Sequence, residues 1–123
     1  MKVVYLAGPI SKGDVRVNVA RAASAHYDLL CHGFAVVNPM LTCWAGWTPA
    51  GDPGPSASAH GPFRTTDYET WIRVGIATAC RCDAVLRLPG ESVGASAECA
   101  AAEACGVPVF TSVSDLIAWR SNL

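Results

Sequence analysis

Ser92-Val93-Gly94-Ala95-Ser96-Ala97-Glu98-Cys99-Ala100-Ala101-Ala102-Glu103-Ala104-Cys105-Gly106 is the most informative segment of the chain. It follows an apolar run, 84–88, and a Pro89-Gly90 turn, so it predicts a helix that begins just after a buried strand. Nearly every residue in it is small, which allows a helix to pack closely on a sheet. Glu98 lies about one turn inside this helix. Glu103 comes five residues later, so it points elsewhere and is expected in solvent.

Short apolar segments and helical patterns alternate along the rest of the chain. Strands are predicted at 2–7, 34–38, 84–88 and 108–110, and the further helices at about 15–32, 67–80 and 113–120. Asp14 is the expected cap of the first helix, and Ser112 or Ser114 that of the last. This order predicts one α/β domain over residues 1–123, with a parallel sheet and helices on both faces.

The first predicted helix has an apolar face that should pack on this sheet. Its members recur at helical spacing: Val19, Ala23, Tyr27 and Leu30. Right-handed crossovers place the first and third strands side by side, and ligands of such sheets bind beyond the carboxyl ends of the strands. The loop at 8–13 and the segment at 92–98 should therefore face one crevice.

Composition excludes several classes of protein. The chain has 123 residues, is 51% hydrophobic and 15% charged, and carries a net charge of −1 without a basic block. These values predict a globular domain that does not bind polymeric nucleic acid. No apolar run approaches the roughly 18 residues that a membrane span needs. The first residues enter a strand pattern at once, so we expect no signal peptide, no membrane partner and a cytoplasmic protein.

The six cysteines form no C-x-x-C, and the histidines have no ligand-like spacing to them. Free buried thiols in a reducing compartment are therefore expected, without metal. The loop at 41–66 is long for a compact domain and rich in Gly, Pro and Ser. Its aromatic residues, Trp44, Trp47 and Phe63, favour a lid or a ligand wall.

Three residues are candidates for chemistry at the crevice. Glu98 is either a surface acid in a first helical turn or a carboxylate placed to act as a nucleophile or a base. Asp67, at the start of its helix, either compensates the helix dipole or forms a second carboxylate beside Glu98. Tyr5 lies near the end of the first strand, where its hydroxyl could reach the site. Asp83 lies at the opposite end of the sheet and is expected to be structural.

Two segments could hold an anionic or polar part of a ligand. Ser92 and Gly94 stand at the predicted positive end of the Glu98 helix, where the alternative is a plain helix cap. The first loop offers close backbone approach, a hydroxyl and a cation. Its residues are Gly8, Pro9, Ile10, Ser11, Lys12 and Gly13.

The sequence resembles the nucleoside 2-deoxyribosyltransferase superfamily. The resemblance rests on Tyr5-Leu6-Ala7-Gly8-Pro9-Ile10, on Asp67 opening a helix, on 92–98, and on Gly106-Val107-Pro108-Val109. The Ser-x-Gly-x-x-x-Glu spacing is closest to the branch of 2-deoxynucleoside 5-monophosphate N-hydrolases and CMP hydrolases. The resemblance covers the chain in order, apart from the loop at 41–66.

This resemblance implies a flavodoxin-like (Rossmann-like) three-layer α/β/α fold with four to five parallel strands. It also implies cleavage of the base–sugar bond of a (deoxy)nucleoside 5-monophosphate through a glycosyl-enzyme intermediate on Glu98. Asp67 would assist departure of the base, and Tyr5 would lie near the nucleophile. Ser92 and the first loop would hold the 5-phosphate, and the long loop would select the base. No metal or organic cofactor is implied.

The family also implies a homodimer or larger homo-oligomer that completes its sites near the C-terminus, where Ser112, Ser114 and Asn122 are candidates. The first loop departs from the hydrolase branch, which tends to carry Ser and Arg where this chain has Pro9 and Ser11, beside Lys12. Three alternatives stay open: a deoxyribosyltransferase that exchanges bases, a non-catalytic nucleotide-binding module, and a structural domain.

Overall fold

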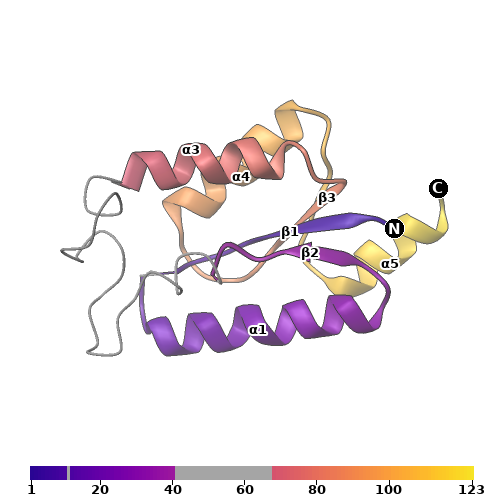
Figure 1. The fold of residues 1–123 in the computed structure, drawn as a ribbon, viewed down its shortest axis with the longest axis horizontal. Coiled ribbons are helices and arrows are strands. Elements are labelled where there is room, and N and C mark those ends of the chain that lie inside the picture. Colours follow the sequence, from indigo (N-terminus) through magenta and orange to yellow (C-terminus); the bar gives the residue numbers. More distant parts are fainter. Residues whose placement is uncertain (11, 41–67) are drawn as a thin grey trace.

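The computed structural model of the chain describes residues 1–10, 12–40 and 68–123, without the side chains of Tyr68 and Thr70. Helices and strands alternate in these ranges as the sequence predicts (Figure 1). The elements are β1 (Val3–Ala7), α1 (Val15–Cys31), β2 (Ala35–Val37), α3 (Tyr68–Ala79), β3 (Ala84–Arg87), α4 (Val93–Ala104), β4 (Val109–Phe110) and α5 (Val113–Ser121). No helix in the described part of the chain is long and apolar enough to cross a membrane.

The described strands form one parallel sheet in the order β2-β1-β3-β4. β1 therefore lies beside β3, as the crossover rule predicts, and Tyr5 is in register with Val85. The two strands end together at Ala7 and Arg87, so the loops that follow them begin at the same edge of the sheet.

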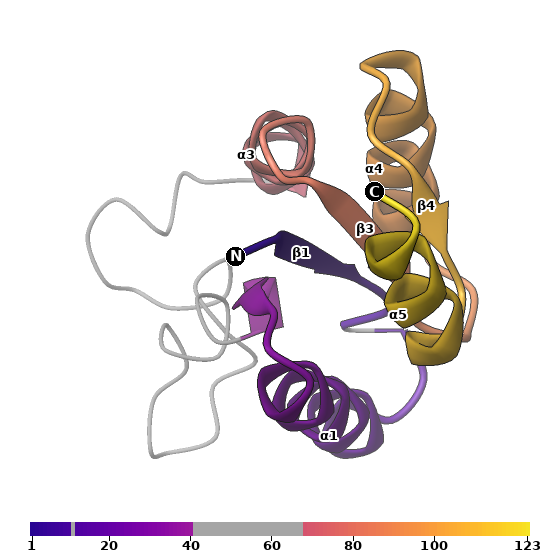
Figure 2. The ribbon, with the colours of Figure 1, turned by 90° about the vertical axis from the view of Figure 1, so that its right-hand side faces the viewer.

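Helices cover both faces of this sheet (Figures 1 and 2). Side chains of Tyr5, Ala7 and Val85 pack under α3 and α4, mainly against small residues of those helices. The residues on the other face of β1 and β3 pack against α1, α5 and Phe34. That cluster comprises Val4, Leu6, Leu29, Phe34, Ala84, Leu86 and Leu116. The result is the three-layer α/β/α arrangement expected of a flavodoxin-like fold.

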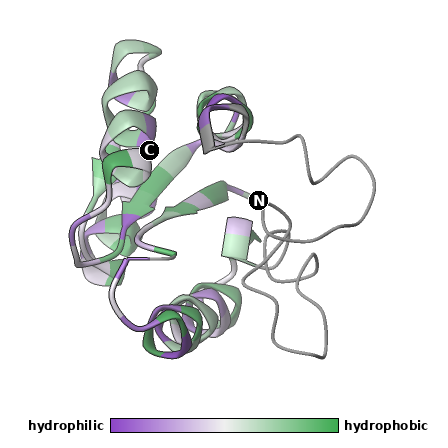
Figure 3. Ribbon diagram, turned by 90° about the vertical axis from the view of Figure 1, so that its left-hand side faces the viewer, coloured by the Kyte–Doolittle hydropathy of each residue, from purple (hydrophilic) through white to green (hydrophobic). Residues whose placement is uncertain are grey.

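The prediction for the buried face of α1 is wrong. Tyr27 is 71% exposed and Leu30 is 51% exposed, whereas Asn18, Ala22 and Leu29 are buried. Hydrophobic and hydrophilic residues alternate around this helix, so its apolar residues do not form a single stripe (Figure 3). The face that packs is set by the neighbours: Leu29 joins the core cluster under the sheet, and the Asn18 amide donates to the carbonyl oxygen of Ile10 in the first loop.

Serine and aspartate side chains cap helices and bind backbone N–H groups at the positions predicted from the sequence. Asp14 and Ser92 cap α1 and α4, and Ser112 rather than Ser114 caps α5. Asp83 accepts a hydrogen bond of 2.8 Å from the backbone N–H of Val3, which supports its structural interpretation.

The five cysteines that the structure describes are free, but the expectation that the thiols are buried is only partly right. Cys82 and Cys99 are buried in the sheet–helix interface. Cys31 and Cys105 are exposed, and Cys80 is half-buried. The exposed ones lie at helix ends, where the chain leaves the core.

Candidate functional site

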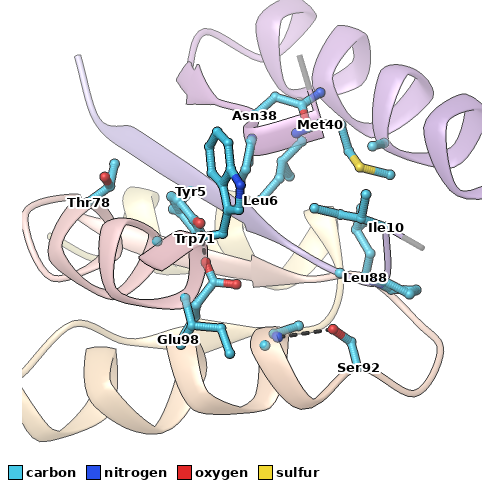
Figure 4. Close-up of a pocket in the computed structure, with 18 of the residues that line it drawn as sticks. Tyr5, Leu6, Ile10, Asn38, Met40, Trp71, Thr78, Leu88, Ser92 and Glu98 are labelled. Atoms are coloured by element: carbon cyan, nitrogen blue, oxygen red, sulfur yellow. Dashed lines mark hydrogen bonds between the residues drawn. The ribbon is translucent and has the colours of Figure 1, made fainter. Parts of the chain in front are cut away.

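A cavity of about 260 Å³ lies at the carboxyl ends of β1 and β3, between α3 and α4 on one side and the residues that follow β2 on the other (Figure 4). Its lining is mostly apolar, with a few polar groups that converge on it. The polar side chains among the described lining residues are Tyr5, Lys12, Asn38, Thr78, Ser92 and Glu98.

Glu98 and Tyr5 meet at the bottom of this cavity. Tyr5 comes from the central strand and is 1% exposed, and its hydroxyl donates a hydrogen bond to the Glu98 Oε2. Glu98 comes from α4, and the two side chains point toward each other (Figure 4). In the described part of the chain, no hydrogen bond is seen at the other carboxyl oxygen, Oε1. The carboxyl group is thus anchored through one oxygen.

Burial makes Glu98 chemically different from a surface acid. Desolvation of its carboxylate raises the pKa of Glu98, and the hydrogen bond from Tyr5 and the positive charge of Arg87 partly offset this rise. A carboxyl group with a raised pKa holds its proton to higher pH, and its ionised form is less solvated than usual. Such a carboxylate is suited to act as a nucleophile, as a base or as an acid.

Gly75 makes room for this pair. It lies in the middle of α3, and a Cβ added there would approach the Glu98 Cδ and the Tyr5 hydroxyl oxygen to 2.9 Å each. Glycine inside a helix costs about 1 kcal/mol relative to alanine, so its presence indicates a packing requirement. Sequence reasoning missed Gly75, although a glycine inside a helical pattern was the available signal.

The corner between β3 and α4 is held by side chains as well as by its backbone. The Ser92 Oγ accepts a hydrogen bond of 3.1 Å from the Ala95 N–H, which caps α4 at the cavity. Arg87 donates to the carbonyl oxygens of Leu88 and Gly90, at 2.5 and 2.8 Å, and Arg21 donates to that of Pro89. These bonds fix the approach to the helix.

The first loop forms the facing wall. Gly8, Pro9, Ile10 and Lys12 line the cavity, whereas Gly13 is exposed, does not line it and adopts a φ of +82° in the turn before α1. Ser11 lies outside the described residues.

Asn18 of α1 braces this loop, because its side-chain amide donates to the carbonyl oxygens of Ile10 and Lys12 at 3.0 and 2.8 Å. The Lys12 ammonium forms an ion pair of 2.7 Å with Glu91, and both side chains are largely exposed. This pair connects the two predicted anion-holding segments.

Comparison with known proteins assigns the chain to a family. Residues 2–111 match the family described as "Domain of unknown function (DUF4406)". The chain belongs to the DUF4406 family. Among curated protein sequences, none matches this chain.

The fold of this DUF4406 chain is similar to that of a solved 2-deoxyribosyltransferase from the psychrotolerant bacterium Bacillus psychrosaccharolyticus. The TM-score is 0.54 and the sequence identity is 20%, over 87% of this chain and 69% of that one. At this identity the likeness concerns the fold, and it confirms the flavodoxin-like arrangement that the resemblance implies.

Several predicted residues lie outside the described part of the chain. These are Asp67 and the loop aromatics Trp44, Trp47 and Phe63, so their roles remain predictions. Near the C-terminus, Ser112 caps α5, Ser114 is exposed, and Asn122 is exposed at the end of α5. Within the described ranges, no three His, Cys, Asp or Glu side chains gather closely enough to hold a metal ion.

Other lining residues were not singled out from the sequence. Trp71 and Thr78 of α3 line the cavity, as do Asn38 and Met40 just after β2 (Figure 4). The Asn38 Oδ1 accepts from the Met40 N–H at 3.0 Å, and its amide contacts the His26 ring at 3.2 Å. The position of Asn38 at the carboxyl end of a strand was a usable signal, whereas nothing in the α3 pattern distinguishes Trp71 from a core residue.

Proposed function

We propose that this chain is an N-glycosidase that hydrolyses the base–sugar bond of a (deoxy)nucleoside 5-monophosphate through a glycosyl-enzyme intermediate on Glu98. The observation that carries the proposal is the Glu98 carboxyl group itself. It lies in a mostly apolar cavity at the carboxyl edge of a parallel sheet, with Oε2 bound by Tyr5. The resemblance to nucleoside deoxyribosyltransferases, in the sequence and in the fold, supports this chemistry.

In the first step, Glu98 Oε1 attacks the anomeric carbon of the sugar. A C–O bond to the carboxyl group forms, the C–N bond to the base breaks, and its electron pair leaves with the base. The base takes up a proton as it departs, and we assign this donor role to Asp67, which the sequence places at the start of α3. The Tyr5 hydroxyl keeps the carboxylate aligned for attack by holding Oε2.

In the second step, water resolves the intermediate. The water oxygen attacks the anomeric carbon, and the bond between that carbon and Glu98 breaks, so Glu98 leaves as a carboxylate with the electron pair of that bond. A general base, which we assign to Asp67, accepts the proton of the water. Because two displacements occur at one carbon, the configuration of the sugar is retained.

The proposal also assigns the residues that bind the 5-phosphate of the substrate. Of the described lining residues, Lys12 is the one with a cationic side chain, and it forms an ion pair with Glu91, which directly precedes the lining residue Ser92. Ser92 and Gly94 present the amino-terminal end of α4 to the space between. A phosphate bound there would draw the exposed Lys12 away from Glu91 and accept hydrogen bonds from the helix end.

The test is incubation of the protein with a panel of nucleosides and their 5-monophosphates, followed by chromatography for free base. We expect base release from at least one monophosphate and slower release from the matching nucleoside. No base from any compound, with a folded sample, would rule out the hydrolase. Equal rates for the nucleoside and its monophosphate would rule out the proposed phosphate contact and leave the hydrolase proposal standing.

Glu98→Gln provides the matched test of the nucleophile. We expect a loss of activity of at least about 1,000-fold, since removal of a nucleophile typically costs this much or more. Glu103→Gln on the same helix is the control, because Glu103 is exposed and does not line the cavity. Retained activity in Glu98→Gln would exclude Glu98 from its proposed role.

The second candidate is base exchange, which is favoured by the likeness to the solved 2-deoxyribosyltransferase. Here the nitrogen of a second base, instead of water, attacks the glycosyl-enzyme. Adding a second free base to the same assay separates the two functions. Exchange faster than hydrolysis would identify a transferase, and release of base without exchange would identify a hydrolase.

A further inference from the structure

Two cysteines meet at the end of the α3–α4 pair that lies away from the cavity. Cys80 directly follows α3, and Cys105 is the C-cap of α4. Their sulfur atoms are 2.9 Å apart, with the Cys105 thiol donating to the Cys80 sulfur. The Cys80 thiol donates in turn to the carbonyl oxygen of Ala101, at 3.5 Å. Two sulfurs already in contact need only small side-chain rotations to become bonded.

The surroundings of the pair allow a small oxidant to reach it. Cys105 is exposed and Cys80 is half-buried. Because Cys105 is the more exposed of the two, it is the thiol that an oxidant in solution reaches first. The remaining described thiols differ: Cys82 and Cys99 are buried, and Cys31 ends α1, on the other side of the sheet (Figure 2).

We propose that Cys80 and Cys105 are a reversible disulfide site, oxidised by small-molecule disulfides such as oxidised glutathione. The proposal is independent of any activity at Glu98. It rests on the contact between two sulfurs that are carried by different helices, together with the exposure of one of them.

The reaction balances as two thiol–disulfide exchanges. The Cys105 thiolate attacks one sulfur of oxidised glutathione, a mixed disulfide forms, and one glutathione leaves as its thiolate. The Cys80 thiolate then attacks the Cys105 sulfur, the protein disulfide forms, and the second glutathione leaves. The protein loses two electrons and two protons, and one oxidised glutathione becomes two reduced molecules.

The disulfide would join the ends of α3 and α4 and link two positions that are 25 residues apart in the chain. Such a cross-link stabilises a fold by restricting the unfolded chain. It would also fix the spacing of the two helices that bring Gly75 and Glu98 together. We therefore expect the oxidised protein to melt several degrees higher than the reduced protein.

The experiment is equilibration of the reduced full chain in glutathione buffers of increasing oxidised fraction. Remaining thiols are then alkylated, and the protein is cut with trypsin and a glutamyl endopeptidase. Arg81 separates Cys80 from Cys82, and Glu103 separates Cys105 from Cys99, so these four thiols fall in four different peptides. We expect a linked peptide pair of Cys80 and Cys105, lighter by two hydrogen atoms than the reduced pair.

Single variants give the controls. Cys105→Ser should remove the link and the rise in melting temperature, while Cys31→Ser should keep both. If Cys80 and Cys105 are both found alkylated, and therefore still reduced, in a buffer that oxidises a reference dithiol, the proposal is overturned. A link that joins either cysteine to a different thiol, or a melting rise that persists in Cys105→Ser, would overturn it equally. Because the readout is mass and melting, failure here would leave the proposed glycosidase unaffected.

Discussion

The two glutamates of α4 have the same chemistry in solution and opposite surroundings in the fold. Glu98 lies against Tyr5 and Gly75 at the bottom of a cavity, and burial raises its pKa. Glu103 lies one and a half turns further along the helix and is exposed. Only the part of α4 near its amino-terminal end faces the cavity, whereas its other end reaches solvent.

The difference shows that the neighbours of a carboxylate, rather than the helix that carries it, set its burial and its pKa. α4 supplies small residues, and so α3 approaches closely enough for Gly75 to touch the Glu98 carboxyl group. The rigid Tyr5 ring from the central strand then fixes one oxygen. If this is right, changing the neighbours of Glu98 should alter its behaviour while Glu103 stays unaffected.

Gly75→Ala should have the largest effect among changes that leave Glu98 in place. The new methyl group would displace the flexible Glu98 carboxyl group rather than the buried Tyr5 ring. A shift of about 1 Å in a reacting group can cost roughly 100-fold in rate, and we expect a loss of kcat/KM of that order. Steady-state kinetics on the best substrate of the panel would measure it.

Ala77→Gly is the matched control on the same helix, because Ala77 is exposed. It should lower stability by about 1 kcal/mol through helix propensity and leave kcat/KM unchanged. A kcat/KM equal to that of the wild type in Gly75→Ala would mean that the reaction does not depend on the absence of a side chain at position 75.

Tyr5→Phe should have a smaller effect, with a characteristic pH dependence. The hydrogen bond from Tyr5 lowers the pKa of Glu98, so its removal should raise that pKa further. A nucleophilic carboxylate must be ionised, so the acid limb of the kcat/KM profile should move to higher pH. At neutral pH we expect a loss of about 10-fold. An unmoved acid limb would mean that the hydrogen bond does not tune Glu98.

The sequence was sufficient for the fold because its patterns are local. Short apolar runs separated by glycine and proline define the strands, and Asp14, Ser92 and Ser112 mark helix starts by their own hydrogen bonds. The adjacency of β1 and β3 followed from chain handedness alone. The buried face of α1 could not be predicted, because two sets of residues fit a helical period and only the neighbouring layer selects one.

The candidate site divides in the same way. Glu98, Tyr5 and Ser92 were predictable, since each stands at a carboxyl end of a strand or just after it. Trp71 of α3 was not, because helical periodicity does not reveal which face of a helix meets which neighbour, and the glycine signal at Gly75 indicates a close contact without naming its partner. Contacts between elements distant in sequence, such as the Lys12–Glu91 pair, depend on the assembled fold.

Glu98→Gln should make the folded protein more stable at neutral pH, independently of any activity. Burial raises the pKa of Glu98 above 4.5, the value of an unperturbed glutamate, so the folded state binds the proton more tightly than the unfolded state. Stability therefore falls as pH rises through 4.5 toward the folded pKa, and the penalty is complete above it. Glutamine has no charge to desolvate, and we expect a gain on the order of 1 kcal/mol.

Urea unfolding at two pH values tests this sign. The advantage of Glu98→Gln should be present at pH 7 and should vanish below the unperturbed value of 4.5. Glu103→Gln removes the same charge from the exposed end of α4 and should show no such advantage. A difference between Glu98→Gln and wild type that is the same at both pH values would contradict the buried-carboxylate interpretation.

Ser92→Ala should give the smallest effect on the reaction, and Ser112→Ala is its natural partner. Each serine accepts one hydrogen bond of 3.1 Å from a backbone N–H in the first turn of its helix. Loss of either cap should therefore cost about 1 kcal/mol in urea unfolding. Of the two, only Ser92 lines the cavity, so only Ser92→Ala should also raise KM, by a few-fold, and more for a 5-monophosphate than for its nucleoside. Equal KM values in the two variants would mean that Ser92 caps α4 without contacting the substrate, which would leave Glu98 as the residue of α4 proposed to act in the reaction.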